Sequence, residues 1–373
     1  MGKIEVLIVD DSPAARRLLT DLLSEDPGIA VIGTANDPFE AAAKMREGLP
    51  DVLMLDLELP RMDGLTFLGK IMQQHPLPVV ICSSHTEAGS RNALKALEMG
   101  ASEVIAKPRL TSPAARAEAQ IRLSDAVRAA AHVGRRKGLG AQATTRTPPK
   151  PAPAPLQPGP KLTADAILPP PRAGGVVPAG LPPLIAIGAS TGGTEALATL
   201  LPQLPATTPP LVITQHMPEK FTTTFARRLD GLSPMTVREA RHGDRTEPGL
   251  ALIAPGDRHM LVRRQGRGYR IELIDGPYVA RHRPSVDVLF RSVAIAAGSA
   301  AMGVIMTGMG DDGARGMLEM RAAGGDTVAQ DEASCIVWGM PGEAVRLGAA
   351  IRQAPLDRLA QEITRFAVKA GVA

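Results

Sequence analysis

The stretch Leu184–Gly193, LIAIGASTGG, decides the fold of the second half of this 373-residue chain. Its first four residues are apolar and predict a short buried strand, and the sequence from Thr194 onward has the pattern of a helix. Glycines between the two let the backbone turn sharply and let a ligand come close. A strand, a tight turn carrying Ser190 and a helix are the parts of a nucleophile elbow, and equally of a phosphate-binding turn.

The α/β pattern continues through residues 184–373, which we assign to one domain. Apolar runs alternate with helical stretches, which predicts a doubly wound, mainly parallel sheet. Its strands are expected at 184–187, 211–214, 251–253, 303–307 and 327–330. An antiparallel hairpin is expected at 259–264 and 269–274, around a turn at 265–268. A helix at 356–370 is either part of the core or a contact surface.

A serine, a histidine and a pair of aspartates follow three strands of this predicted sheet. Ser190 follows the first strand, His216 the second, and Asp311 and Asp312 follow the strand at 303–307. The carboxyl ends of parallel strands meet at one edge, so these side chains can form the set that nucleophilic hydrolysis requires. Their order in the chain differs from the Ser, Asp, His order of α/β-hydrolases, so that fold is not expected.

Residues 1–132 form a second α/β pattern with five strands. The strands are expected at 4–9, 30–34, 52–55, 79–82 and 104–106, and the helices at 14–23, 38–47, 66–73 and 91–99. Five βα units of this length predict a flavodoxin-like parallel sheet that binds its ligand at the carboxyl ends of the strands.

Polar side chains gather at the carboxyl edge of this first sheet. They are Asp10 and Asp11, Asp56, Ser83 and Ser84, and Lys107. Three carboxylates at one edge repel one another unless a cation joins them, and such oxygen ligands suit Mg²⁺. The edge therefore predicts a site for a divalent ion and a phosphoryl group, with which the lysine can pair.

Residues 133–183 are expected to be a Pro-rich flexible linker. Thirteen prolines lie between 147 and 183, so we expect no core there. A helix at 114–132, with Ser112 as its N-cap, precedes the linker. Residues 108–183 contain eleven Lys and Arg but only three Asp and Glu, so the net charge of this segment is +8. The net charge of the whole chain is +4. The rest of the chain is therefore net −4, which argues against a nucleic-acid-binding surface on the folded parts.

Composition also bears on the location of the protein. The sequence has no apolar run of about 18 residues and no secretory signal pattern, so we expect no direct membrane insertion. The two cysteines, Cys82 and Cys335, lie far apart without metal-ligand spacing. Both observations suit a reducing compartment, and we expect a cytoplasmic protein.

The first domain resembles the receiver domain of two-component response regulators. The resemblance rests on Asp10, Asp11, Asp56, Ser83, Lys107-Pro108 and Met62-Asp63-Gly64. It implies that Asp56 accepts a phosphoryl group from a histidine kinase. It also implies that Mg²⁺ is held by the carboxylates of Asp10, Asp11 and Asp56 and the backbone carbonyl of Glu58. Ser83 and Lys107 are implied to contact the phosphoryl group.

The second domain resembles the effector domain of bacterial chemotaxis protein-glutamate methylesterases, which are also glutamine deamidases. The motifs that carry the resemblance are IGASTGGTEAL, ITQHMP, IAPGDRHM, GPYVARHRPSVDVLF, GVIMTGMGDDGARGM and AQDEASCIVWGMPGEAV. They run along nearly all of the domain. Together the two resemblances cover both domains but not the Pro-rich linker.

This second resemblance implies a role for each residue that matches a family motif. Ser190 is implied as nucleophile, His216 as base and Asp312 as the orienting acid, since the family pattern is Gly-Met-Gly-x-Asp-Gly. The backbone N–H of Met309 is implied as an oxyanion donor, with Thr191 beside the nucleophile. His259 and the Arg281-His282-Arg283 run are expected to line a substrate groove. No cofactor is expected for the hydrolysis, and Mg²⁺ belongs to the first domain.

The two resemblances imply a phosphorylation-regulated serine hydrolase. It would demethylate glutamate methyl esters, releasing methanol, and deamidate glutamines on the cytoplasmic domains of methyl-accepting chemoreceptors, giving chemotactic adaptation. A chemotaxis histidine kinase would be the phosphodonor. From the residues alone two alternatives stay open: an output domain that binds a phosphate or nucleotide at GASTGG without catalysis, and one that binds DNA.

Overall fold

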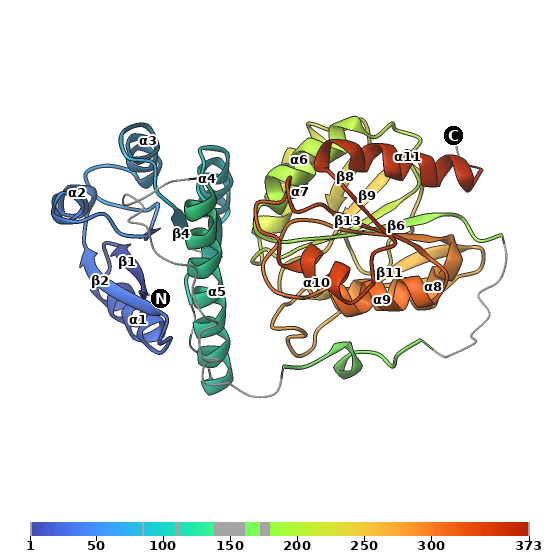
Figure 1. The fold of residues 1–373 in the computed structure, drawn as a ribbon, viewed down its shortest axis with the longest axis horizontal. Helices are drawn as coiled ribbons and strands as arrows, with labels where there is room; N and C mark the ends of the chain where they lie inside the picture. Colours follow the sequence, from blue (N-terminus) through green and yellow to red (C-terminus); the bar gives the residue numbers. More distant parts are fainter. Residues whose placement is uncertain are drawn as a thin grey trace. The chain divides into compact units, whose positions relative to one another are not determined.

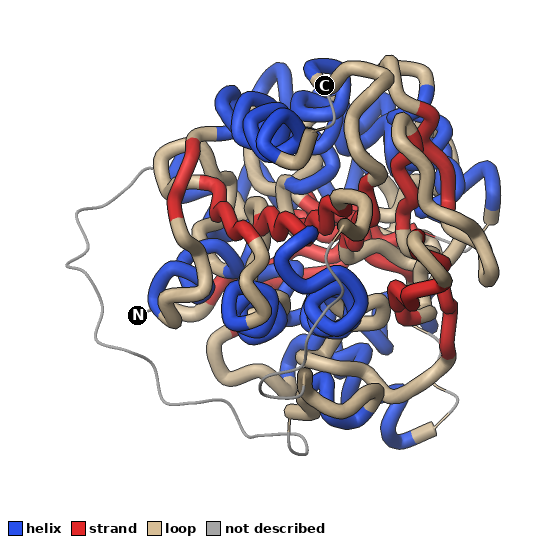
Figure 2. Tube along the Cα trace, turned by 90° about the vertical axis from the view of Figure 1, so that its right-hand side faces the viewer, coloured by secondary structure: helices blue, strands red, loops and turns tan. Residues whose placement is uncertain are grey.

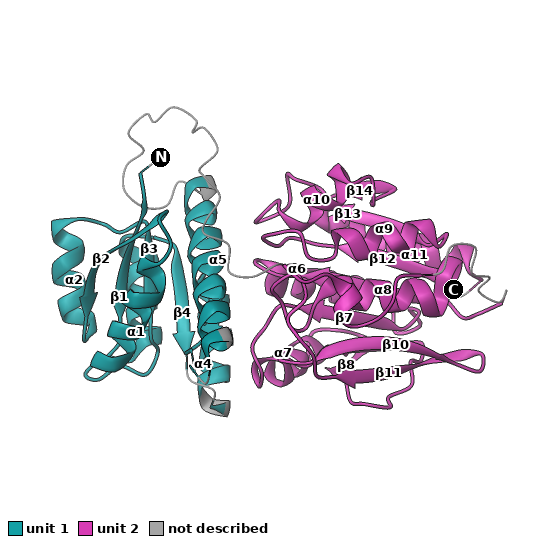
Figure 3. Ribbon diagram, turned by 90° about the horizontal axis from the view of Figure 1, so that it is seen from below, with its two compact units in different colours: residues 1–160 teal, residues 161–373 magenta. Residues whose placement is uncertain are grey.

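The computed structural model describes residues 2–83, 86–108, 110, 112–137, 161–171 and 180–371. The chain divides into two compact units, residues 1–160 and 161–373 (Figure 3). In each unit the strands form a central layer with helices outside it (Figures 1 and 2). Among the described residues, no helix combines the length and the apolar character needed to cross a membrane.

The first unit is a five-stranded parallel sheet with the order β2-β1-β3-β4-β5. Its strands are β1 (Ile4–Val9), β2 (Ile29–Ala35), β3 (Val52–Leu55), β4 (Val79–Ser83) and β5 (Glu103–Ala106). Its helices are α1 (Pro13–Ser24), α2 (Pro38–Glu47), α3 (Gly64–Gln74), α4 (Glu87–Glu98) and α5 (Pro113–Lys137). The strand order confirms the flavodoxin-like prediction.

Local sequence explains where several of these elements begin and why they are buried. Ser12 and Asp37 cap α1 and α2 by accepting backbone N–H groups, and a proline follows each cap. All four residues of β3 are buried, as expected for a strand covered on both faces. Residues of α1 and α5 share one core cluster with β1, β3 and β4, so these two helices cover the same face.

The second unit is built on a seven-stranded parallel sheet with the order β14-β13-β12-β6-β7-β9-β8. Its strands are β6 (Leu184–Ala189), β7 (Leu211–Gln215), β8 (Thr236–Glu239), β9 (Leu250–Ile253), β12 (Ala301–Ile305), β13 (Asp326–Gln330) and β14 (Arg352–Ala354). The antiparallel hairpin of β10 (His259–Gln265) and β11 (Gly268–Ile274) forms a separate two-stranded sheet. The parallel sheet and the hairpin are both as predicted, whereas the edge strands β8 and β14 are additional.

Helices cover both faces of this sheet. They are α6 (Gly193–Leu200), α7 (Phe221–Asp230), α8 (Val286–Ala297), α9 (Ala314–Ala322), α10 (Met340–Arg346) and α11 (Leu359–Lys369), with short 3₁₀ turns η1 (Ala164–Ala166), η2 (Leu201–Gln203), η3 (Gly298–Ala300) and η4 (Leu356–Arg358). Figure 1 shows α6, α7 and α11 on one face and α8, α9 and α10 on the other. The C-terminal helix α11 buries Leu359, Ile363 and Phe366, so it is part of the core.

The order of the strands places a topological switch point between β6 and β12. The chain enters the sheet at β6 and extends it to one side through β7, and it later returns to the other side of β6 with β12. In parallel α/β sheets, ligands bind at the carboxyl ends of the strands beside such a point. The segments that follow β6 and β12 therefore lie where a site is expected.

A short part of the predicted linker belongs to the core of the second unit. Ala164 and Leu168 are buried and share a cluster with Leu261, Val279 and Val288. The Arg291 guanidinium donates to the Asp165 carboxylate at 2.6 Å and to the Leu168 carbonyl at 3.0 Å. The prediction that nothing between 147 and 183 joins a core is therefore wrong for this segment, because its apolar residues stand between the prolines. Residues 138–160 and 172–179 lie outside the described residues.

Candidate active site and phosphoacceptor site

Ser190 lies directly after β6, in a turn that its backbone contacts hold in place. Its N–H donates to the carbonyl of Thr307 at 3.0 Å, which ties it to the end of β12. Its carbonyl accepts from the Gly193 N–H at 2.7 Å and from the Gln215 side chain at 2.9 Å. Gly192 has φ 78°, a left-handed conformation that favours glycine, and α6 begins at the next residue. The strand, turn and helix of the predicted elbow are all present.

The loop that follows β12 packs against Ser190. A Cβ atom placed on Gly308 would lie 2.7 Å from the Cβ of Ser190 and 2.4 Å from the sulfur of Met340, so only glycine fits there. The Gly308 carbonyl accepts from the N–H groups of Gly339 and Met340, which fixes the start of the loop. Met309, the expected oxyanion donor, is the next residue. Thr191 is buried, and its carbonyl accepts from the Thr307 hydroxyl.

His216 and Asp312 form a hydrogen-bonded pair beside this loop. The backbone N–H of His216 donates to the carbonyl of Ala189, the residue before Ser190. The Nε2 atom of His216 lies 2.8 Å from Oδ2 of Asp312, whose side chain is buried. Asp311 instead pairs with Lys161. Of the two adjacent aspartates, the structure therefore pairs Asp312 with His216, as the motif implied.

Three further donors, all from the start of α8, surround the Asp312 carboxylate. Oδ1 accepts from the Ser285 hydroxyl at 2.8 Å and from the Asp287 N–H at 3.0 Å, and Oδ2 accepts from the Val286 N–H at 2.8 Å. Burial alone would raise the pKa of Asp312, but these hydrogen bonds and His216 outweigh it and lower the pKa to about 2. Asp312 is therefore ionised at neutral pH.

No sequence pattern assigned a role to these residues at the start of α8. Ser285 is the N-cap of α8, and Asp287 lies in its first turn. A serine followed two residues later by an aspartate at the start of an apolar helical stretch is an N-terminal signature. That signal identifies the helix start, but not that the start faces Asp312.

The other nitrogen of the His216 ring, Nδ1, lies on the side of the ring away from Asp312. Nδ1 is buried and has no hydrogen-bond partner among the described residues, so no hydrogen bond joins it to Ser190. In a neutral ring whose Nε2 donates to Asp312, Nδ1 carries the lone pair. The ring of His282 stacks on that of His216, with centroids 3.6 Å apart and planes inclined by 6°. Catalytic hydrogen bonds are often incomplete before the substrate binds.

His259 does not line a surface, and the prediction that it lines a substrate groove is wrong. Its side chain is completely buried. Its Nε2 donates to the Pro277 carbonyl at 2.9 Å, and its Nδ1 accepts from the Ser285 N–H at 3.2 Å. Burial lowers the pKa of His259, so the ring is neutral. His259 therefore supports Ser285, which in turn donates to Asp312.

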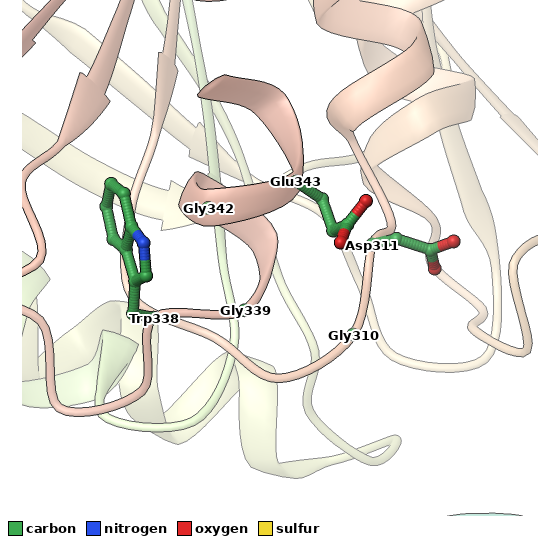
Figure 4. Close-up of a pocket in the computed structure, with 6 residues that line it drawn as sticks. All are labelled: Gly310, Asp311, Trp338, Gly339, Gly342 and Glu343. Atoms are coloured by element: carbon green, nitrogen blue, oxygen red, sulfur yellow. The ribbon is translucent and has the colours of Figure 1, made fainter. Parts of the chain in front are cut away.

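A pocket of about 530 Å³ opens beside the loop that follows β12. Its lining residues are Gly310, Asp311, Trp338, Gly339, Gly342 and Glu343 (Figure 4). The carboxylates of Asp311 and Glu343 lie near each other in this view, and the indole of Trp338 lies apart from them. The lining includes neither Ser190 nor His216, so the pocket borders the loop without containing the His216–Asp312 pair.

The first unit brings the predicted acidic residues together at the carboxyl edge of its sheet. Asp10 and Asp11 follow β1 and Asp56 follows β3, and one carboxylate oxygen of each lies within 4.8 Å of the others. Such a set of oxygen atoms fits a hard divalent cation such as Mg²⁺. Lys107 Nζ lies 2.7 Å from Oδ2 of Asp56 and 2.8 Å from Oδ2 of Asp10.

Burial and charge act in opposite directions in this cluster. Burial raises the pKa of Asp56, and the hydrogen bond and charge of Lys107 only partly offset it. Burial would lower the pKa of Lys107, but its two carboxylate partners outweigh burial and raise it. Lys107 therefore stays a cation that compensates buried acids.

Three further residues were predicted at this edge: Glu58, which lies two residues after Asp56, Ser83 at the end of β4, and the next residue in the chain, Ser84. The Glu58 N–H donates to Asp56 Oδ1 at 3.2 Å, which holds the segment that carries the Glu58 carbonyl. Ser83 ends β4 and is completely buried, with its hydroxyl 3.5 Å from the carbonyl of Gly89. Ser84 lies outside the described residues.

Known proteins match the chain over both units. The CheB methylesterase family matches residues 185–363, and the response regulator receiver domain family matches residues 6–113. A "protein-glutamate methylesterase/protein-glutamine glutaminase of group 3 operon" from Cereibacter sphaeroides is 57% identical over 363 residues, covering 97% of this chain and 94% of the relative. A "protein-glutamate methylesterase/protein-glutamine glutaminase 5" from Anaeromyxobacter dehalogenans is 56% identical, covering 97% and 96%.

A solved structure matches the second half of the chain. The CheB methylesterase catalytic domain of Thermotoga maritima is 35% identical, with a TM-score of 0.48, and covers 49% of this chain and 98% of that domain. The full-length relatives match both units in one chain. The chain thus belongs to the family of protein-glutamate methylesterase/protein-glutamine glutaminases, with a receiver domain ahead of the methylesterase domain.

Proposed function

We propose that this chain hydrolyses methyl esters of glutamate side chains in proteins and also the side-chain amides of glutamines. The first reaction releases methanol and the second releases ammonia, and both leave a glutamate carboxylate. The observation that carries the proposal is the buried pair of His216 and Asp312, located next to Ser190 at the switch point of the sheet. Family membership supports the same substrates.

In the proposed mechanism Ser190 is the nucleophile. Its Oγ attacks the ester carbonyl carbon while its proton moves to Nδ1 of His216, the nitrogen without a partner. Asp312, ionised and held by four hydrogen bonds, stabilises the imidazolium that forms. The backbone N–H of Met309 is the proposed donor to the oxyanion.

The remaining steps complete the cycle and return the enzyme to its starting state. The carbon–oxygen bond to the methoxy group breaks, and His216 gives its proton to the departing methanol. Water then attacks the acyl-enzyme while His216 takes its proton, and His216 returns that proton to Oγ of Ser190 as the bond between Oγ and the acyl carbon breaks. A glutamine follows the same route with ammonia as leaving group, so neither reaction needs a cofactor.

The proposed substrates are the cytoplasmic domains of methyl-accepting chemoreceptors, which places the enzyme in the cytoplasm. The names of the relatives specify protein glutamate and glutamine side chains. An enzyme that edits such residues and carries a receiver domain fits a signalling pathway in which methylation sets receptor sensitivity. The chemoreceptor assignment follows from this combination.

The receiver is proposed to control the esterase through Asp56. A chemotaxis histidine kinase would donate the phosphoryl group. Asp10, Asp11 and Asp56, with the carbonyl of Glu58, would hold Mg²⁺, which supplies positive charge next to the phosphoryl oxygens. Ser83 and Lys107 would contact the phosphoryl group, and Lys107 already pairs with Asp56. Phosphorylation would then raise the rate of the methylesterase domain.

The experiment that tests the catalytic proposal combines methanol release with labelling by a serine-directed phosphonate. We expect Ser190→Ala to lose methanol release on the order of 10⁶-fold, which is effectively no release, and to take up no label, because the nucleophile is gone. Ser299→Ala, a serine change at an exposed position of the same unit, should behave like the wild type. Methanol release by Ser190→Ala at the wild-type rate would contradict the proposal and make GASTGG a phosphate-binding turn.

A further inference from the structure

The helices α8 and α9 cap each other at their N-terminal ends. Asp312 stands just before α9, and its carboxylate accepts the N–H groups of Val286 and Asp287 in the first turn of α8. Asp287 in turn points back to α9: its Oδ1 accepts from the N–H of Gly313 at 3.0 Å and of Gly316 at 2.7 Å. A carboxylate next to each helix therefore accepts N–H groups from the start of the other, and α8 is capped by Ser285 as well.

Helix α9 has no side-chain cap of its own. Its N-cap residue is Gly313, with φ 94°, and no side chain at that position accepts from the helix. The two helices also touch at this end, since a Cβ on Gly316 would lie 2.8 Å from the Asp287 carbonyl. N–H groups in the first turn of a helix have no intrahelical partner, and leaving them unpaired in a buried site is costly. Asp287 is thus what satisfies the start of α9.

The position of the Asp312 carboxylate depends on this arrangement. Asp312 is joined to α9 through Gly313, and its oxygens are bound to the start of α8 and to His216. A shift of the first turn of α9 against α8 would carry Asp312 away from Nε2 of His216. Two sets of hydrogen bonds resist that shift. The Asp312 carboxylate is bound to the start of α8, and the Asp287 carboxylate is bound to the start of α9.

We propose that Asp287 is a positioning residue of the hydrolase: through the N-terminus of α9 it holds Asp312 in hydrogen-bonding contact with His216. The inference rests on the proposed function, because it assigns Asp287 a part in orienting the triad. Asp287 is buried, and its hydrogen bonds described above join it to Asp312, Gly313 and Gly316. Its contribution lies in the two hydrogen bonds that Oδ1 accepts from the N–H groups of Gly313 and Gly316 at the start of α9.

Substitutions at position 287 separate hydrogen bonding from charge. Asp287→Ala removes the oxygen that accepts both hydrogen bonds, and we expect kcat to fall on the order of 100-fold with KM unchanged, the cost of a small displacement of a catalytic group. Asp287→Asn keeps an oxygen acceptor at Oδ1, so it should restore kcat to near the wild-type value. Asp287→Glu moves the acceptor by one methylene and should give an intermediate loss of kcat, which provides a test even where the alanine variant is poorly folded.

The matched control breaks the same pair of helices at another point. Glu319 on α9 accepts from the Arg291 guanidinium on α8 at 2.8 Å and has no contact with Asp312. Glu319→Ala should lower the stability of the domain, as Asp287→Ala does, but leave kcat unchanged. If Glu319→Ala lowers kcat as much as Asp287→Ala, or if Asp287→Ala and Asp287→Glu both keep the wild-type kcat, the positioning role is wrong.

The same assay must also contain Ser190→Ala, so that the two proposals fail separately. An inactive Ser190→Ala together with a fully active Asp287→Ala would overturn only the positioning role. An active Ser190→Ala would overturn the serine mechanism itself, whatever the 287 variants do. Methanol release by the full chain at saturating and subsaturating ester gives kcat and KM for every variant.

Discussion

At the residue scale, the central feature is the number of contacts that hold one carboxylate. Asp312 accepts hydrogen bonds from His216, Ser285, Val286 and Asp287, and its pKa is lowered to about 2 in spite of its burial. A carboxylate held this way keeps both its charge and its direction. In the proposed mechanism, the charge would stabilise the imidazolium, and the direction would leave Nδ1 of His216 as the base.

This feature predicts a large effect of Asp312→Asn. The amide keeps the shape of the side chain but lacks the negative charge, and one of its atoms becomes a donor that faces other donors. We expect kcat for methanol release to fall by about 10⁴-fold. Asp311→Asn is the matched control, because Asp311 contacts Lys161 rather than His216. Equal losses in the two variants would contradict the assigned pair.

The neighbouring Asp287 predicts a pH-dependent change in stability. Burial, and then the charge of Asp312, raise the pKa of Asp287 to about 7. The folded protein therefore keeps a proton that the unfolded chain releases near pH 4, so this group's contribution to stability falls from about pH 4 to about pH 7. The amide of Asp287→Asn does not titrate, so the variant does not lose this stability. Its free energy of unfolding should therefore rise relative to that of the wild type as the pH rises.

The measurement is urea unfolding of Asp287→Asn and wild type at about pH 5 and about pH 8. The difference in unfolding free energy should favour the variant more at the higher pH. Asp275→Asn, which removes an exposed carboxylate, serves as the control and should show a smaller change between the two pH values. A difference between Asp287→Asn and wild type that does not vary with pH would contradict the raised pKa.

At the element scale, the close approach of two loops at the switch point depends on Gly308. We expect Gly308→Ala to lower kcat on the order of 100-fold, because its Cβ would lie 2.7 Å from that of Ser190 and displace the nucleophile. Overpacking should also lower stability by about 1–3 kcal/mol. Gly268→Ala is the control, since no atom lies within 4 Å of its added Cβ. An unaffected Gly308→Ala enzyme would show that the loop can move freely.

The segment Lys161–Leu168 is a second element whose role can be tested. Leu168 is buried in a cluster of the second unit, whereas Leu162 is 40% exposed. We expect Leu168→Ala to lower the free energy of unfolding by about 2 kcal/mol and Leu162→Ala to change it little. Denaturant unfolding of both variants gives the comparison. Equal, small effects would mean that the segment adds nothing to the core.

Strands that are buried along most of their length were predicted from the sequence, whereas the less buried edge strands of the second unit were not. The central strands β1, β3 and β6 are runs of apolar residues, and their predicted positions are confirmed. The edge strands β8 and β14 read TVRE and RQA and have no apolar run to detect. The buried position of the segment around Leu168 was not predicted for a related reason. Its few apolar residues lie between prolines, and the whole stretch was therefore interpreted as a linker.

The candidate site was predictable where a residue directly follows a strand. Ser190 and His216 are found next to each other in this way, and the pairing of Asp312 with His216 was expected from the motif. The contacts of Asp287 depend on how closely α8 approaches α9, which no local pattern encodes. His259 was assigned to a groove because a histidine near a motif suggests function, although it is completely buried.

At the scale of the whole molecule, one chain carries two separate reactive sites. The first unit holds an acidic cluster with Lys107, and the second holds the His216–Asp312 pair. The contacts described above for each site join residues of the same unit. The account therefore predicts that a change at the first site alters the regulation of the esterase but not its basal rate.

Asp56→Asn is the variant that isolates this regulation. We expect it to keep the basal rate of methanol release and to lose any increase caused by a small phosphodonor with Mg²⁺, because the acceptor carboxylate is absent. Asp51→Asn is the matched control, since Asp51 lies at the opposite end of β3. It should respond to the phosphodonor like the wild type. A phosphodonor response in Asp56→Asn would contradict the assignment of the acceptor.

The most direct test of the central claim is methanol release from methylated chemoreceptor fragments by the full chain, with and without the phosphodonor and Mg²⁺. The account predicts that the wild type releases methanol and is accelerated by the phosphodonor. Asp56→Asn should release methanol without acceleration, and Ser190→Ala should release none under either condition. Release by Ser190→Ala at the wild-type rate would contradict the claim that this chain is a serine methylesterase.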